Sequence, residues 1–93
     1  MAEDDLKGAI TAFDEALLAY EGQKSSKVAD KRFSTVMLRA QALIELKRYK
    51  EAHTAFKTAS KMAKKGKQKR QVRQWRDYLK IEEEREKTML GTS

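Results

Sequence analysis

Apolar residues recur every three or four positions along most of the chain, which is the period of an amphipathic helix. The first apolar stripe spans about Asp4 to Tyr20, and the second spans about Lys27 to Leu46. The third spans about Tyr49 to Lys64, and the fourth about Gln68 to Met89. The pattern therefore predicts four helices and an all-α fold.

The residues between the stripes indicate how the helices end and begin. Gly22 suits a left-handed C-cap after the first helix, and Ser25 or Ser26 suits the N-cap of the second. Gly66 marks the end of the third helix. Because the turn between the second and third helices is very short, we expect these two helices to pack antiparallel.

Composition narrows the class of protein. The chain has 93 residues, enough for one small domain or a fragment of a longer array, and it contains neither proline nor cysteine. A disulfide framework and a thiolate metal site are therefore excluded. No apolar run approaches the roughly 20 residues that span a bilayer, and the acidic N-terminus is unlike a signal peptide. We expect no membrane partner and a cytoplasmic or nuclear location.

One short pattern, Ala-x3-Phe-x2-Ala, occurs twice, beginning at Ala9 and again at Ala52. Its small residues let a neighbouring helix approach closely, and its phenylalanine fills the space between them. The residues of the two copies are Ala9, Phe13 and Ala16, then Ala52, Phe56 and Ala59. This pattern resembles the second helix of the tetratricopeptide (TPR) repeat, a helical hairpin.

The resemblance divides the chain into a half-repeat over about 4–20, a full repeat over about 27–64 and a capping helix over about 68–89. It implies an antiparallel four-helix hairpin stack that acts as a protein-interaction adaptor. Arg39 occupies the usual leucine position, and Lys64 stands where proline often ends the unit. The two motifs lie 43 residues apart, against a repeat of about 34.

Two longer stretches carry a narrower resemblance. The segments ALLAYEGQKSSK and STVMLRAQALIELKRYKEAHTAF, followed by the lone Trp75 in a basic helix, are similar to the end of one kind of TPR domain. That TPR domain precedes a CS domain in co-chaperones that serve ubiquitin-ligase and kinetochore assembly. The resemblance implies that this chain is the adaptor part of a co-chaperone.

The TPR resemblance also implies a groove along the second helix for a peptide or helix. Its lining residues are expected to be Met37, Leu38, Gln41, Ile44 and Glu45. Alternatively, the apolar members of this set pack against neighbouring helices. The paired asparagines with which some TPR domains clamp a chaperone carboxylate are absent, since the chain has no asparagine.

Charge is concentrated in one stretch of the chain. Between Lys61 and Lys80 there are nine lysines and arginines against Asp77 alone, a net charge of +8 where the whole chain has +7. Such a patch attracts acidic protein surfaces or phosphates. We predict a basic docking patch of Lys69, Arg70, Arg73 and Arg76. The alternative is a solvated face that only keeps the protein in solution.

An RNA- or phosphate-binding helical module is the alternative function. RNA binding usually adds aromatic residues that stack on bases. Trp75 lies in step with Val72 and Leu79, which favours core packing, whereas Tyr78 is a candidate for exposure.

Catalysis has little support in the sequence. His53 is the only histidine and is expected at the surface, and the chain has no cysteine and no glycine-rich phosphate loop. We expect no enzyme activity, no cofactor and no metal site. Beyond Leu79 the apolar face becomes Glu82 and Glu86, which predicts that the last turns are solvated.

The first helix has only the second helix to cover its apolar stripe. We expect its other edge to be open, and a second copy of the chain, a neighbouring domain or a part of the array lost by truncation could supply the missing cover.

Overall fold

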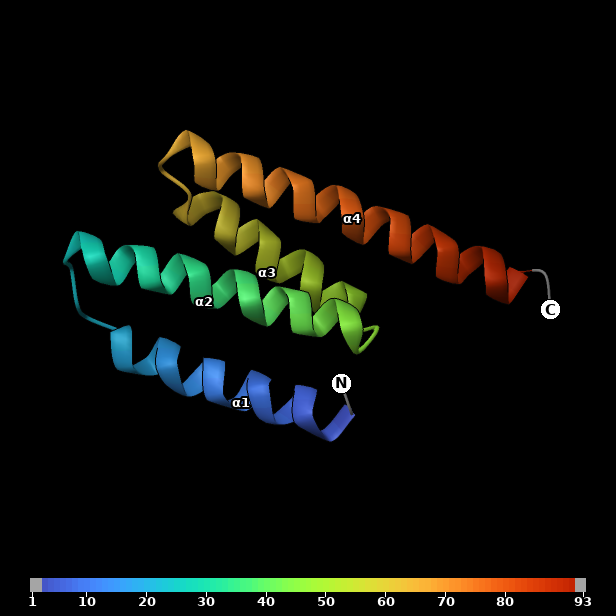
Figure 1. Cartoon of the computed structure of the whole chain (residues 1–93), viewed down its shortest axis with the longest axis horizontal. Helices are drawn as coiled ribbons and strands as arrows, with labels where there is room; N and C mark the ends of the chain where they lie inside the picture. The colour runs from blue at the N-terminus through green and yellow to red at the C-terminus, as the bar shows by residue number, and fades with distance from the viewer. Residues whose placement is uncertain (1–2, 92–93) are drawn as a thin grey trace.

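A computed structural model describes residues 3–91 of the chain. These residues form four α-helices. They are α1 (Glu3–Tyr20), α2 (Ser26–Glu45), α3 (Tyr49–Met62) and α4 (Gly66–Gly91). Figure 1 shows the helices side by side, with successive helices running in opposite directions, and residues 3–91 contain no strand. The predicted all-α stack of four antiparallel helices is confirmed, and each predicted helix end lies within two residues of the observed one.

The connection between α1 and α2 uses the two signals predicted for it. Gly22 has a φ of 85°, a left-handed conformation that glycine adopts without steric cost. The Ser25 hydroxyl oxygen accepts a hydrogen bond of 3.2 Å from the backbone N–H of Val28. Ser25 is therefore the N-cap of α2.

The turn between α2 and α3 is a Schellman motif with lysine at the position that usually holds glycine. The Lys47 N–H donates to the Ile44 carbonyl and the Arg48 N–H donates to the Leu43 carbonyl, each at 2.9 Å. Lys47 has a φ of 63°, which is uncommon for a residue with a side chain. The two nested hydrogen bonds reverse the chain within three residues and bring α3 antiparallel to α2.

The turn between α3 and α4 is held by Asp30 of α2. The Gln68 Oε1 accepts hydrogen bonds from the backbone N–H groups of Lys64 and Lys65, at 3.1 and 3.2 Å. The Gln68 Nε2 donates to one oxygen of Asp30 at 3.2 Å, and the Lys65 ammonium lies 3.1 Å from the other. These contacts fix the position where α4 begins.

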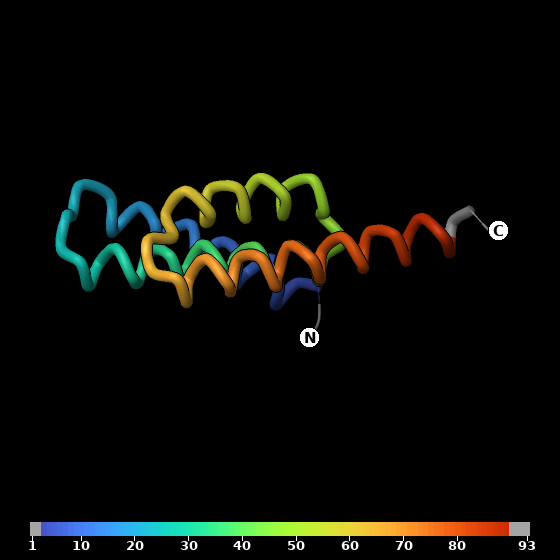
Figure 2. The backbone as a smooth tube through the Cα atoms, turned by 90° about the horizontal axis from the view of Figure 1, so that it is seen from above, coloured from blue at the N-terminus to red at the C-terminus, as the bar shows by residue number. Residues whose placement is uncertain are grey.

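The core is built around α2, which packs against all three other helices. In the view of Figure 2, α2 and α4 overlap in one layer while α3 lies to one side of them. Phe56 of α3, Leu43 of α2 and Leu79 of α4 are the largest fully buried side chains. Ala29 is spaced like the apolar residues of α2, but it lies near the start of the helix and is exposed.

The two copies of the repeated motif lie in different surroundings. The second copy is fully buried because α3 packs against both α2 and α4. In the first copy, Ala9, Phe13 and Ala16 are only half-buried. Among the described residues α1 packs against α2 alone, so the expected open edge is present.

The last helix is the longest, with 26 residues, and its C-terminal turns extend past the other three helices (Figures 1 and 2). No helix within residues 3–91 combines the length and the apolar character needed to cross a membrane.

Candidate functional site

A polar groove of about 410 Å³ runs between α3 and the first half of α4. Helix α3 contributes Ser60 and α4 contributes every other lining residue. Those residues of α4 are Lys69, Val72, Arg73, Arg76, Asp77 and Lys80. We call this the basic groove.

Helical periodicity explains why four cations share the basic groove. Residues 69, 73, 76 and 80 are separated by four, three and four positions, which places their side chains on one face of a helix. At 1.5 Å per residue they span roughly 16 Å along the helix axis. Val72 and Leu79 lie on the neighbouring face and are buried, so α4 cannot turn about its axis without exposing them. The core therefore holds the row of cations in place.

The cations of the basic groove have no charge partner among the residues that the structure describes. Among residues 3–91, Lys69, Arg73, Arg76 and Lys80 make no ion pair within 4.0 Å. Asp77 lines the same groove and also makes no such pair. Like charges one helical turn apart destabilise a helix by a few tenths of a kcal/mol per pair. The groove thus carries four positive charges against one negative charge.

The predicted basic patch is partly reproduced by this groove. The structure brings Lys69, Arg73 and Arg76 together, whereas Arg70 does not line the groove. Lys80 was missed, although its place four residues after Arg76 on the same face would have revealed it. The sequence did not indicate that Ser60 belongs to the site, because nothing local in the sequence shows which residue of α3 faces α4. Whether the patch binds a partner stays a prediction.

Only some of the residues expected to line a groove along α2 are accessible. Met37 and Ile44 are only 4% and 5% exposed and belong to the core, so neither is accessible to a partner in this fold. Leu38 is 48% exposed, Glu45 is exposed and Gln41 is half-buried. The difference arises because α2 packs against all three other helices and the side chains of Met37 and Ile44 belong to the core. None of the five lines a hollow described here.

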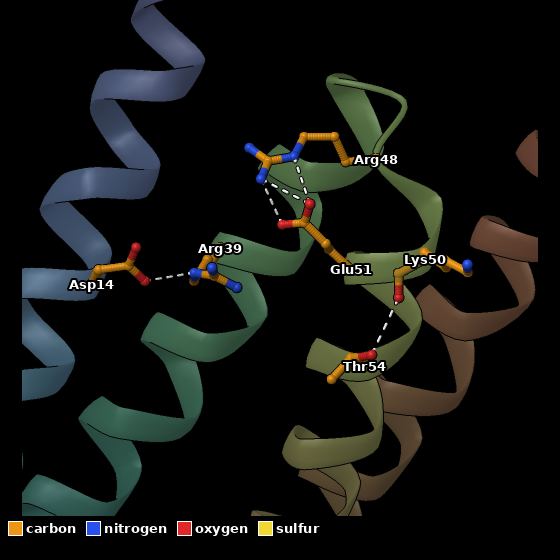
Figure 3. Close-up of polar contacts among 6 residues, drawn as sticks. All are labelled: Asp14, Arg39, Arg48, Lys50, Glu51 and Thr54. Carbon is orange, nitrogen blue, oxygen red and sulfur yellow. Dashed lines mark hydrogen bonds and ion pairs between the residues drawn. The ribbon is translucent and has the colours of Figure 1, made fainter.

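A second hollow, of about 340 Å³, lies between α1 and α3 with α2 as its floor. Leu17, Val36 and Ala55 give it apolar walls, and charged residues stand at its rim. Figure 3 shows Asp14 of α1 pointing at Arg39 of α2, with the Arg39 Nε 2.7 Å from the Asp14 carboxylate.

In the same view Arg48 holds Glu51 through both carboxylate oxygens, the shorter contact being 2.6 Å. Arg39, which lines this hollow, and Arg48, which holds the lining residue Glu51, are therefore already paired, unlike the arginines of the basic groove.

The second half of α4 is acidic, and its carboxylates contact α3 and the turn that precedes it. The His53 Nε2 lies 2.6 Å from Glu83 Oε1, and the Lys47 ammonium lies 3.5 Å from Glu86. Burial, followed by the negative charges of Glu86 and Glu82, raises the pKa of the Tyr49 hydroxyl above its usual value of 10.0.

The prediction that these turns are solvated is therefore wrong for Glu82 and Glu86, which are half-buried. The sequence showed the loss of apolar residues but not the polar partners that replace them. His53, expected at the surface, is likewise half-buried, beside Glu83.

The aromatic residues of α4 lie outside the basic groove. Trp75 is half-buried and packs against the core, and Tyr78 is exposed. Their rings meet edge to face, with centroids 5.4 Å apart and an angle of 87° between planes. The expected core role of Trp75 is confirmed in part, since its ring is not fully buried.

No group of three or more histidine, aspartate or glutamate side chains within the described range is placed to hold a metal ion. No protein-family model, curated protein or solved structure matches this chain.

Proposed function

We propose that this chain is a protein-interaction module that binds an acidic surface of a partner protein in the basic groove. The observation that carries the proposal is the row of four cations on one face of α4, none of which forms an ion pair within residues 3–91. Repulsion between like charges in this row destabilises the helix. A bound ligand of opposite charge relieves that repulsion. The module has no chemistry of its own in this proposal.

The expected affinity is modest. An exposed ion pair contributes about 0.2–1 kcal/mol, so four such pairs give roughly 1–4 kcal/mol before other contacts are added. A focused positive field also accelerates encounter with an acidic partner and makes binding sensitive to salt. We therefore expect a fast, reversible interaction that other contacts must reinforce.

A TPR-type module is the architecture that we propose for this adaptor. The antiparallel hairpin stack and the two Ala-x3-Phe-x2-Ala motifs support it. The open edge of α1 also suits a unit of a longer array or assembly, in which each repeat is covered by its neighbour. The narrower proposal of a co-chaperone adaptor rests on sequence resemblance alone.

The alternative function is binding of RNA or another phosphate-rich ligand by the same groove. The unpaired cations favour it, because phosphates bind lysine and arginine side chains strongly. Two features of the site oppose it. Asp77 adds a negative charge to the groove, and Trp75 and Tyr78, which would stack on bases, do not line it. We therefore place an acidic protein first.

The proposal is tested by titrating isotope-labelled protein with an oligo-glutamate peptide and, separately, with single-stranded RNA, following backbone NMR signals. We expect the peptide to shift signals of Ser60 and of residues 69–80. The double variant Arg73→Glu/Arg76→Glu should abolish these shifts. The matched control Lys67→Glu/Arg70→Glu changes charge equally on the same helix but lies outside the groove, and should retain them.

The outcomes separate the two functions. Equal loss of binding in both double variants would show that net charge, rather than the groove, attracts the peptide, and would refute the proposal. Tighter binding of RNA than of peptide at moderate salt would favour the alternative. With about four phosphate contacts, RNA affinity should fall roughly 50-fold between about 50 and 200 mM salt.

A further inference from the structure

The spacing of the cations in the basic groove indicates the shape of its ligand. We propose that the groove binds an acidic α-helix of a partner protein, lying alongside α4 with carboxylates at positions i, i+4, i+7 and i+11. This inference rests on the proposed function and specifies the secondary structure of the partner.

The axial distances favour a helix over an extended chain. Lys69, Arg73, Arg76 and Lys80 follow one another at about 6, 4.5 and 6 Å along the axis of α4. A second helix repeats these distances, because its residues rise by the same 1.5 Å. Alternate residues of a β-strand are about 6.7 Å apart, so the fourth would lie roughly 20 Å from the first, against roughly 16 Å in the groove. The carboxylates of an extended peptide therefore cannot align with all four cations.

The walls of the groove are mostly polar, and α3 contributes little to them. Ser60 is the one lining residue from α3, and its side chain is small. The floor includes Val72, which is only 3% exposed, so the groove offers the ligand little apolar surface. Ordering a flexible segment costs conformational entropy that ion pairs alone do not recover. We therefore infer that the acidic helix is already formed before binding, as part of a folded partner.

The negative charge of Asp77 provides a further test that an acidic ligand binds in the groove. Its carboxylate lines the groove without an ion pair in the described part of the chain, so it repels a carboxylate-bearing ligand. Asp77→Asn removes one negative charge and leaves the shape of the side chain almost unchanged. This variant should bind an acidic helix a few-fold more tightly.

The test uses three peptides of identical composition and measures their affinities by fluorescence anisotropy. The first is stapled as a helix, with glutamates at i, i+4, i+7 and i+11, because short helices are marginal in water. The second is an equally stapled helix whose glutamates are spread around its circumference. The third has the sequence of the first but contains D-residues that prevent helix formation. Circular dichroism verifies the conformation of each peptide.

We expect the first peptide to bind about tenfold or more tightly than the other two, a difference of about 1.4 kcal/mol. Arg73→Glu/Arg76→Glu should remove this advantage and Lys67→Glu/Arg70→Glu should keep it. Equal binding of all three peptides, lost only in Arg73→Glu/Arg76→Glu, would refute the helical ligand and leave the proposed function standing. Failure of every acidic peptide to bind the groove would refute both.

Discussion

The attachment of α4 to the rest of the protein depends on a few buried side chains, and Leu79 is the largest of them. Leu79 is 0% exposed, whereas Ile81, two residues later on the same helix, is 56% exposed. Leu79→Ala should therefore destabilise the protein strongly. Ile81→Ala is the matched control, because it removes a similar aliphatic side chain from the same helix without opening a cavity.

The magnitudes follow from burial. A buried leucine replaced by alanine costs about 2–5 kcal/mol through lost transfer free energy and a residual cavity. At 0.05–0.15 kcal/mol per residue, a domain of this size has roughly 5–14 kcal/mol of stability in total. We expect Leu79→Ala to cost about 3 kcal/mol and lower Tm by roughly 12–24 °C. Ile81→Ala should change stability by less than about 0.5 kcal/mol, since alanine also has the higher helix propensity.

The assay exploits the position of Trp75, the single tryptophan, on α4. Urea unfolding is followed by far-UV circular dichroism, which reports all helices, and by Trp75 fluorescence, which reports the docking of α4. If α4 and the core unfold together, both probes shift to the same lower midpoint in Leu79→Ala. If α4 detaches first, the fluorescence midpoint falls below the dichroism midpoint.

Either pattern is compatible with the role given to Leu79. Equal destabilisation by the two variants would refute it, because burial would then not determine the contribution of each residue on α4. A loss of less than about 1 kcal/mol in Leu79→Ala would refute it as well, since a fully buried leucine should cost at least twice that amount.

Three further predictions concern the turns and a titratable group. Lys47→Gly should raise the free energy of unfolding by about 0.5–1 kcal/mol in urea titrations. It removes a left-handed penalty of about 1–2 kcal/mol and loses one exposed ion pair worth about 0.2–1 kcal/mol. A decrease would mean that the ion pair with Glu86 outweighs the backbone penalty. Ser25→Ala should lower the thermal midpoint by removing the N-cap of α2, a loss of about 1 kcal/mol, and Ser25→Asp should restore it. Folding raises the pKa of Tyr49, so above pH 10 the folded state binds more protons than the unfolded state does. The free energy of unfolding should therefore be unaffected by Tyr49 below pH 10 and should decrease as the pH rises above 10. Tyr49→Phe should reduce that decline in unfolding experiments at alkaline pH, and an unchanged pH dependence would contradict the assignment.

The helices themselves were predictable, because their causes are local. The three- and four-residue period of apolar positions gave each helix to within two residues of its observed ends. Gly22 was identified, and the N-cap of α2 was narrowed to Ser25 or Ser26, because a left-handed glycine and a capping serine act on their immediate neighbours. The turn at Lys47 was predicted to be short, but its left-handed lysine was not, since propensity alone would place glycine there.

The candidate site could be predicted only in part, because it depends on which faces of two helices meet. The charge of the Lys61–Lys80 segment was visible in the sequence, and so was the row through Lys69, Arg73 and Arg76. That Arg70 lies outside the groove and Ser60 lies inside it depends on the rotation of α4 against α3. That rotation is set by the burial of Val72 and Leu79, a property of the packed molecule.

The sequence by itself determined four amphipathic helices, their order and a concentrated basic charge, because periodicity, capping and composition are properties of short segments. Only the tertiary structure decided which apolar residues were available to a partner, and it removed Met37 and Ile44 from the groove expected along α2. It also decided that the first half of α4 presents unpaired cations while its second half engages His53 and Lys47. The physical reason is the same in both cases: burial and ion pairing arise from contacts between residues far apart in the chain.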